Sequence, residues 1–155
     1  MKLFTTLLAT ALFTAVPLFP QTPDAASEQQ SASSNLIERG KYLVEGASQC
    51  ADCHTPRNQK GGFLRDKWLR GSLIMFKPTV PVPGWMGFAP PIAGLPGWTD
   101  EQAITFLTTG KKPTGTLANA PMPAFRFNRE DAAAITAYLR SLGAESASTG
   151  KPSSK

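Results

Sequence analysis

All of the thiol and imidazole side chains of this chain lie within five consecutive residues. The 155-residue sequence contains two cysteines and one histidine, in the run Cys50-Ala51-Asp52-Cys53-His54. Two cysteines allow at most one disulfide bond, so a scaffold of several disulfides is excluded. A zinc site with four Cys or His ligands is also excluded, because only three such side chains exist. The sequence therefore confines thiol and imidazole chemistry to one site.

The spacing of this run, Cys-x-x-Cys-His, is typical of the covalent attachment of a c-type haem. The two thiols lie on about one helical turn, so each can form a thioether with one vinyl group of the porphyrin. The imidazole of His54 then lies beneath the ring and can bind the iron from the proximal side. We therefore expect one haem c with its iron, bonded to Cys50 and Cys53 through the porphyrin and to His54 through the metal. Ser48 is placed to cap the helical turn.

Three other interpretations of the same residues remain open. Cys50 and Cys53 can form a structural disulfide, although so short a loop adds little stability. They can form a thioredoxin-like redox pair, but no strand that would begin a βαβ unit precedes the motif. A zinc ion would need two further ligands from carboxylates or water, which is unusual for a structural site. The position of the histidine favours haem over all three.

The second axial ligand of the iron is a methionine by elimination. No second histidine exists, so two imidazoles of one chain cannot bind the same iron. Met1 is expected to leave with the N-terminal segment, which leaves Met75, Met86 and Met122. Met122 lies between two prolines, which hold the backbone extended. We predict that Met122 binds the iron, whereas the surroundings of Met75 and Met86 are more typical of wall residues.

The N-terminal segment has the pattern of an export signal. A lysine at position 2 precedes an uncharged apolar run at residues 3–19, and a small-residue cleavage site follows at residues 25–27. We predict that residues 1–27 are a signal peptide. An uncleaved anchor in the inner membrane is the alternative, because the 17 residues at 3–19 reach the lower limit for a span. In both cases the folded part is exported to a bacterial periplasm.

Composition divides the mature chain into three parts. Ser and Gln dominate residues 28–34, and Ser, Lys and Gly dominate residues 144–155, so we expect a solvated linker and a flexible tail. Residues 35–143 remain for one compact domain, in agreement with the chain length. Between residues 55 and 97, closely spaced prolines and glycines leave no room for long elements, although residues 73–76 can form a short strand. A loop of this length needs something to pack on, and an apolar cofactor meets that need.

Three helices are predicted around this Pro/Gly-rich loop, which makes the fold class all-α. The first begins at Asn35, which has a capping-box pattern. The second begins after Thr99 and ends near Gly110. The third begins at Asn128 and ends at Gly143. The expected apolar faces are Leu36, Gly40 and Leu43 in the first helix and Ile135, Tyr138, Leu139 and Leu142 in the third.

The haem motif, a Pro-Met-Pro segment around Met122 and a final helix together resemble a class I c-type cytochrome over about residues 35–143. The resemblance implies a small helical fold around one covalent haem. Several stretches are also similar to the haem domains of cytochrome c subunits of bacterial quinone-linked alcohol and gluconate dehydrogenases. These stretches are residues 40–44, 53–58, 97–101 and 130–139.

The resemblance further implies two contacts within the fold. The first and last helices should cross, with Gly40 allowing a close approach near Tyr138 or Leu139. A backbone carbonyl near residues 90–91 should accept the Nδ1 proton of His54 and so fix the tautomer of the ring.

Other side chains are candidates for contacts with the porphyrin. Arg57, Trp98 and Arg126 can donate to a haem propionate. Aromatic burial of the ring would favour the less charged, reduced iron. The candidates for this burial are Trp68, Phe76, Trp85, Phe88, Phe125 and Phe127.

An iron bound by both His54 and Met122 has no open position, so its function is one-electron transfer rather than catalysis on a substrate. We expect a monohaem electron carrier of the periplasm, not an enzyme, between a donor dehydrogenase or membrane complex and an acceptor. One alternative is an electron-accepting subunit fixed in an oxidoreductase complex, marked by an apolar docking patch at residues 73–88. Another is a haem enzyme or ligand sensor in which Met122 is displaced.

The distribution of charge indicates the kind of partner. The chain carries 16 Lys and Arg against 11 Asp and Glu, and at residues 57–129 the basic side chains outnumber the acidic ones by ten to three. If Lys111, Lys112, Arg126 and Arg129 surround the exposed haem edge, this face steers redox proteins with acidic docking faces. Charge scattered for solubility is the alternative. Nucleic acid is not an expected partner, and a membrane is one only if the N-terminal run stays attached.

Overall fold

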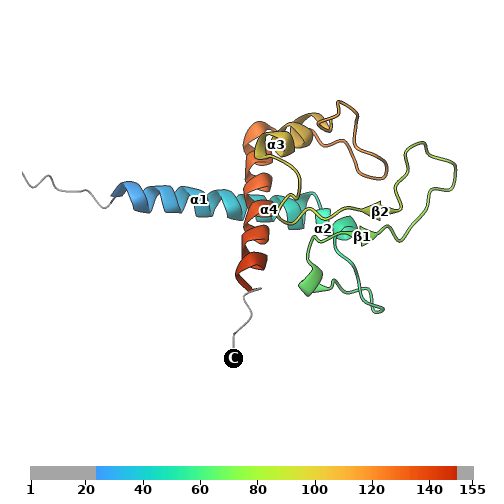
Figure 1. The fold of residues 1–155 in the computed structure, drawn as a ribbon, viewed down its shortest axis with the longest axis horizontal. Coiled ribbons are helices and arrows are strands. Elements are labelled where there is room, and N and C mark those ends of the chain that lie inside the picture. The colour runs from blue at the N-terminus through green and yellow to red at the C-terminus, as the bar shows by residue number, and fades with distance from the viewer. Residues whose placement is uncertain (1–23, 150–155) are drawn as a thin grey trace, which may run out of the picture.

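The computed structural model describes residues 24–149, and its framework is a pair of crossing helices, α1 (Asp24–Tyr42) and α4 (Arg129–Thr149) (Figure 1). A Cβ atom at Gly40 would lie 2.0 Å from the carbonyl oxygen of Ala134 and 2.8 Å from Cβ of Tyr138. A side chain larger than glycine therefore cannot fit at the crossing. The expected close approach near Tyr138 is confirmed. Most of the expected signal peptide lies outside the described residues.

The start of α1 differs from the sequence prediction. The helix begins at Asp24 rather than Asn35, so residues 28–34, expected as a solvated linker, are helical. These residues are exposed, but extending a helix residue by residue costs little once its packed end has formed. The predicted apolar face is also displaced, because Leu36 is 41% exposed whereas Ile37 packs against the core.

The second predicted helix is confirmed as α3 (Asp100–Thr109). It begins with a capping box, in which Thr99 Oγ1 accepts a hydrogen bond from the backbone N–H of Gln102 at 3.2 Å. In return, Gln102 Oε1 accepts from the N–H of Thr99 at 2.9 Å. Gly110 ends the helix with a φ of 71°, a left-handed conformation that favours glycine.

The third predicted helix, α4, begins as expected but does not end at Gly143. Asn128 Oδ1 caps its first turn by accepting a backbone N–H at 2.7 Å. The helix continues to Thr149, so the expected flexible tail is helical up to that point. Gly143 has another function, because a Cβ atom there would lie 2.6 Å from Cα of Gly94. This glycine lets a loop approach the helix instead of ending it.

The core forms where α4 meets the turn that follows α1 and residues of the Pro/Gly-rich loop. Val44, in the π-helical turn Leu43–Ala47 after α1, is fully buried. Leu69, from the loop itself, is fully buried in the same cluster. α4 contributes the residues predicted from its periodicity, namely Ile135, Tyr138, Leu139 and the partly buried Leu142, and also the unpredicted Ala132 and Ala134.

The chain between α2 (Cys50–His54) and α3 forms loops with little regular structure, as predicted. β1 (Ser72–Leu73) and β2 (Phe88–Ala89) pair antiparallel, so that of the strand expected at residues 73–76 only Leu73 lies in β1. A 3₁₀ turn spans Arg65–Lys67. Figure 1 shows the β1–β2 hairpin on the same side of the α1–α4 crossing as α2 and the loop between α3 and α4.

Candidate haem site

The Cys-x-x-Cys-His motif forms the short helix α2, which places both thiols and the imidazole on about one turn. The N-cap position is taken by Gln49, in a left-handed conformation with a φ of 51° and without a side-chain cap. The prediction that Ser48 caps this helix is therefore wrong. Its backbone N–H donates to the carbonyl of Leu43 at 2.8 Å, because the preceding π-helical turn closes there.

Both thiols of the motif are free, and neither is activated as a nucleophile. Burial raises the pKa of Cys50 to about 11, and burial together with the charge of Asp52 raises the pKa of Cys53. A redox-active Cys-x-x-Cys pair has a lowered thiol pKa instead. Among residues 24–149, no cluster of three or more His, Cys, Asp or Glu side chains could hold a metal ion. These properties argue against the disulfide, redox-pair and zinc interpretations.

His54 is oriented for metal binding. Its side chain is 5% exposed, and its Nδ1 lies 2.7 Å from the carbonyl oxygen of Pro90. Because a carbonyl only accepts, the proton is on Nδ1 and the lone pair is on Nε2. Burial lowers the pKa of the imidazole, and the hydrogen bond to Pro90 opposes this effect. The expected contact near residues 90–91 is confirmed, with Pro90 as the acceptor.

The residues of α2 fit haem c. The neutral imidazole presents the lone pair of Nε2 as a metal ligand, and two thiols without a disulfide bond lie on the same turn. When bound, the haem iron supplies one-electron redox chemistry. The polypeptide would supply the two sulfur atoms of Cys50 and Cys53 and the nitrogen of His54, and the Pro90 carbonyl fixes the tautomer of the ring.

The backbone that follows His54 is held by the loop that returns to it. Thr55 is 1% exposed, and its Oγ1 accepts the N–H of the buried Leu69 at 2.9 Å. The carbonyl of His54 accepts the N–H of Gly71 at 2.8 Å. Sequence reasoning missed Thr55, although its place directly after the motif was a usable signal. The hydrogen bond of Thr55 holds the segment at residues 69–71 next to the backbone of His54.

Replacing Thr55 with valine, which keeps the shape of the side chain, should lower the free energy of unfolding by about 1–3 kcal/mol, because the N–H of Leu69 then has no acceptor. Guanidinium unfolding of the holoprotein measures the change. Thr136→Val is the matched control, since Thr136 is equally buried but its hydroxyl donates to the carbonyl of Ala132 within α4. Equal losses in the two variants would contradict the assigned function of Thr55.

Met122 lies in the loop between α3 and α4 and is half-buried. Its N–H donates to the carbonyl of Asn119 at 3.0 Å, and the Ala120–Pro121 peptide bond within the same turn is cis. The carbonyl of Ala120 accepts the N–H of Met86 at 2.7 Å. The Met122 turn is therefore attached to the segment that leads into β2.

The β1–β2 hairpin connects the two predicted iron ligands through hydrogen bonds. On one side, Gly71, just before β1, bonds to the carbonyl of His54, and the Pro90 carbonyl, just after β2, bonds to the His54 ring. On the other side, Met86 bonds to the turn that carries Met122. No sequence pattern indicated that one hairpin would contact both ligand segments.

The three predicted propionate donors are not brought together by any interaction among the described residues. Arg57 donates to the carbonyl of Gly61 at 2.9 Å, pairs with Asp52 at 3.0 Å and lies over the ring of Phe63 at 4.0 Å. Arg126 donates to two carbonyls of its own loop. Trp98 packs edge-to-face on Phe106, with ring centroids 5.3 Å apart. Their contacts with a propionate remain predictions.

The aromatic candidates form separate pairs rather than one continuous wall. Phe76 and Trp85 pack edge-to-face at 5.6 Å, and Phe125 and Phe127 stack at 5.1 Å. Trp68 packs against the helical core, where its Nε1 donates to the hydroxyl of Tyr138 at 3.4 Å. Phe127 packs against the same core cluster as Trp68, so the contacts of these aromatics with a haem remain predictions.

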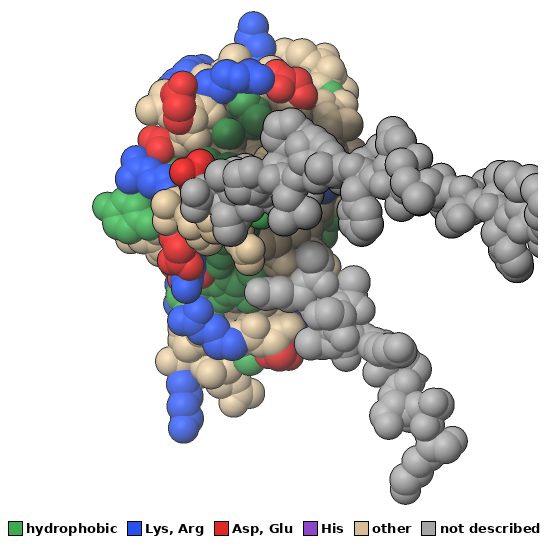
Figure 2. Space-filling model, turned by 90° about the vertical axis from the view of Figure 1, so that its left-hand side faces the viewer, with side chains coloured by type: hydrophobic (Ala, Val, Ile, Leu, Met, Phe, Trp, Pro, Cys, Tyr) green, Lys and Arg blue, Asp and Glu red, His purple; other side chains and the backbone are tan. Residues whose placement is uncertain are grey.

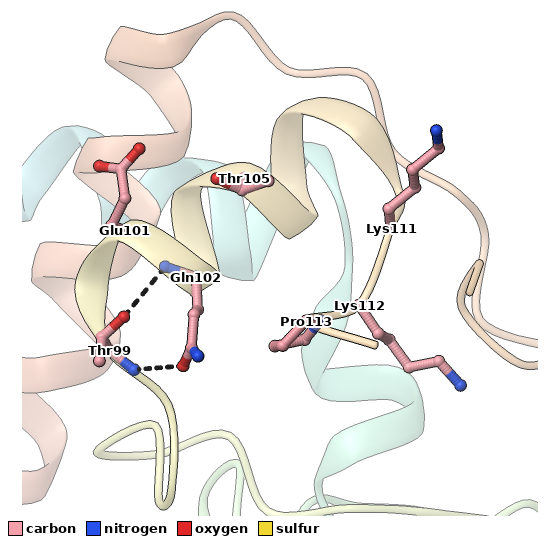
Figure 3. Close-up of a pocket in the computed structure, with 7 residues that line it drawn as sticks. All are labelled: Thr99, Glu101, Gln102, Thr105, Lys111, Lys112 and Pro113. Atoms are coloured by element: carbon pink, nitrogen blue, oxygen red, sulfur yellow. Dashed lines mark hydrogen bonds between the residues drawn. The ribbon is translucent and has the colours of Figure 1, made fainter. Parts of the chain in front are cut away.

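A shallow pocket of about 250 Å³ lies away from α2, beside the start of α3 (Figure 3). Its lining includes the capping box and the loop that follows the helix, and Figure 3 shows the ammonium ends of Lys111 and Lys112 directed away from Thr99. None of the predicted iron ligands or propionate donors lines it. The pocket is therefore not part of the haem site.

The helical fold and the donor set of α2 define a small domain built to attach haem c. Residues 37–143 match the family model for cytochrome c. The chain therefore belongs to the cytochrome c family, and its chemistry is haem-based electron transfer.

Curated relatives support the same assignment. The chain is 36% identical over 115 residues to a "Diheme cytochrome c-type" protein of Cereibacter sphaeroides, covering 69% of this chain and 36% of that protein. It is 30% identical over 141 residues to the gluconate 2-dehydrogenase cytochrome c subunit of Pantoea cypripedii (81% and 31%). It is 31% identical over 135 residues to the fructose dehydrogenase cytochrome subunit of Gluconobacter japonicus (75% and 26%). The chain thus spans only about a quarter to a third of the length of these relatives.

Proposed function

We propose that this chain is a monohaem electron carrier that takes single electrons from a donor dehydrogenase or membrane complex and passes them to an acceptor in the periplasm. The observation that carries the proposal is the Nδ1–Pro90 hydrogen bond, which leaves Nε2 of His54 to bind iron beside two free thiols. Met122, on the loop linked to the same hairpin, is the proposed second axial ligand. An iron closed on both sides exchanges electrons without binding substrate.

Optical spectra with a pyridine haemochrome assay test this function. We expect one haem per chain, resistant to acid–acetone extraction because it is covalently attached. The oxidised protein should show the weak charge-transfer band of an Fe(III)–thioether bond. A colourless protein with two alkylatable thiols would rule out the proposal, and a haem without that band would rule out Met122.

The charges of the described residues support a basic face only in part. Arg129 forms a two-fold ion pair with Glu101, at 2.8 and 3.1 Å, which lowers the pKa of that carboxyl. Lys111 and Lys112 lie in the same loop between α3 and α4 as Met122. Lys111 is exposed, and Lys112 donates to the side chain of Asn119 at 2.8 Å. Figure 2 shows acidic and basic side chains intermixed on the side turned away from the hairpin. We propose that Lys111 and Lys112 steer acidic partners.

Replacing Lys111 and Lys112 together with glutamine should slow oxidation of the reduced protein by ferricyanide by about two- to fivefold at low ionic strength, because the anion loses a positive approach potential. Stopped-flow absorbance measures the rate. The effect should disappear at high salt, and a cationic cobalt oxidant should show the opposite trend. Equal rates for the variant and the parent with both oxidants would contradict steering by these lysines.

A specific observation favours the second candidate function, a cytochrome subunit fixed in an oxidoreductase complex. From Ser72 to Thr99 the chain carries one charge, on Lys77. Large apolar side chains on this stretch are exposed, Met75 by 84% and Leu73 by 67%. Two of the relatives are named as cytochrome subunits of dehydrogenases, so the proposed occupant of this surface is an uncharged face of a larger dehydrogenase subunit. The further exposed members are Phe76, Val80, Met86 and Phe88.

Purification of the tagged chain from its native cells distinguishes the two functions. A fixed subunit should bring down a stoichiometric dehydrogenase subunit at both low and high salt, and Met75→Ser with Leu73→Ser should release it. A carrier should elute as a monomer.

The same purified protein tests the proposed location, because N-terminal sequencing shows whether residues 1–27 have been removed or residues 3–19 remain as an anchor. No described helix is long and apolar enough to cross a membrane.

A further inference from the structure

One arginine side chain holds the loop before α3 against α4. Arg140, on α4, donates through Nη1 to the carbonyl oxygens of Gly94 at 2.6 Å and Leu95 at 3.2 Å, and through Nη2 to that of Trp98. Its Nε donates to a carboxylate oxygen of Asp100 at 2.7 Å. The planar guanidinium thus satisfies three carbonyls of one loop and the first residue of the next helix.

The loop that Arg140 holds is also tied to the core by its backbone. The N–H of Gly94 donates to the carbonyl of Leu139 at 2.7 Å. The N–H groups of Ile92 and Ala93 both donate to the carbonyl of Leu69, at 2.9 and 3.1 Å. Pro90, which accepts the His54 proton, lies two residues before Ile92. A short and well-bonded path therefore runs from α4 to the His54 ring.

The loop conformation needs this external support. Leu95 has a φ of 49°, and a non-glycine residue in the left-handed region costs about 1 kcal/mol or more. Three of the carbonyls in this segment accept from the guanidinium, and losing Arg140 would remove that donor from all three, although the carbonyl of Leu95 would keep the N–H of Trp98 at 3.1 Å. Without Arg140 we expect the segment at residues 94–98 to relax, and Pro90 lies only four residues before Gly94.

We propose that Arg140 is a positioning residue for the proximal iron ligand. By clamping residues 94–98 onto α4, it fixes the Pro90 carbonyl that holds the Nδ1 proton of His54 and so sets the orientation and basicity of Nε2. The inference rests on the proposed function, since it concerns the residue that binds the haem iron. Arg140 acts through the loop and not by contact with the haem.

Four holoprotein variants separate this clamp from ordinary stabilisation. Arg140→Gln removes the guanidinium group and its charge. Arg140→Lys keeps the charge, but its single ammonium nitrogen cannot reproduce the bonds to all three carbonyls. Asp100→Asn removes the ion pair and leaves the carbonyl bonds. Arg129→Gln is the matched control, because Arg129 also lies on α4 and also pairs with an acidic residue in the first turn of α3.

Haem content is measured first, so that failure to attach haem tests the proposed function separately. The readouts are then the hydrogen-exchange rate of the His54 Nδ1 proton by NMR and the reduction potential. Arg140→Gln should exchange this proton about tenfold faster or more, with a shifted potential, and Arg140→Lys should lie between it and the parent. Asp100→Asn and Arg129→Gln should stay within about twofold of the parent.

Two results would overturn the proposal. One is an unchanged exchange rate and potential in Arg140→Gln. The other is an equal change in Arg129→Gln, which would show that overall stability and not the clamp controls the proton. If Arg140→Gln is not recovered as folded protein, Arg140→Lys decides, and a parental exchange rate in that variant also overturns the proposal.

Discussion

Replacing His54 with alanine is expected to abolish stable holoprotein. The imidazole is the only one in the sequence, and its Nε2 is the donor left after Nδ1 bonds to Pro90. No other imidazole can take its place, so the recovered haem per chain should fall by at least about tenfold, as metal affinity does when even a supporting residue is lost. The pyridine haemochrome absorbance per milligram of purified protein measures the loss.

The control for His54→Ala is Thr136→Val, a buried substitution in α4 distant in sequence from the motif. It should retain haem at the level of the parent. Adding imidazole to the growth medium or buffer should partly restore the low-spin spectrum of His54→Ala, because the free ligand can occupy the vacated iron position. A fully loaded His54→Ala protein with an unaltered spectrum would show that another group binds the iron.

Replacing Met122 with alanine is expected to give the second large effect. Loss of the thioether removes the ligand that favours reduced iron, so the reduction potential should fall by on the order of 100 mV, within the roughly 0.8 V range that axial ligands set. The iron should also gain an open position that binds cyanide or carbon monoxide rapidly. Spectroelectrochemistry and stopped-flow ligand binding measure the two changes.

The other methionines are the matched controls for Met122→Ala. Met75→Ala should have no effect, because Met75 is 84% exposed. Met86→Ala tests the nearest alternative, since the N–H of Met86 bonds to Ala120 beside the Met122 turn. If Met86→Ala and not Met122→Ala removes the charge-transfer band, the ligand assignment is wrong.

Local sequence signals predicted the elements whose cause is local. The capping box at Thr99 and the Asn128 cap mark the starts of α3 and α4, because the side chain and the N–H that it binds are only a few residues apart. The end of α4 was missed for a non-local reason. A glycine such as Gly143 commonly ends a helix. Here it lies within α4 because a side chain at this position would collide with the backbone of Gly94, nearly 50 residues earlier in the chain.

The site shows the same division. The spacing of the motif predicts Cys50, Cys53 and His54 without reference to the rest of the chain. The resemblance placed an acceptor for His54 near residues 90–91, and the contact is present. By contrast, the Arg140 clamp joins a helix to a loop more than 40 residues away. No periodicity or motif encodes such a bond, although a charged side chain directly after the buried Leu139 was a weak signal.

The crossing at Gly40 has a consequence for the order of events during biosynthesis. Its two sides, Gly40 and Ala134, come from opposite ends of the domain, so the contact that closes the core forms only when almost the whole domain has been synthesised. Until that segment has been synthesised, the thiols of Cys50 and Cys53 are not enclosed by a finished core. The chain topology thereby leaves an interval in which both sulfur atoms are accessible for bonding to the porphyrin.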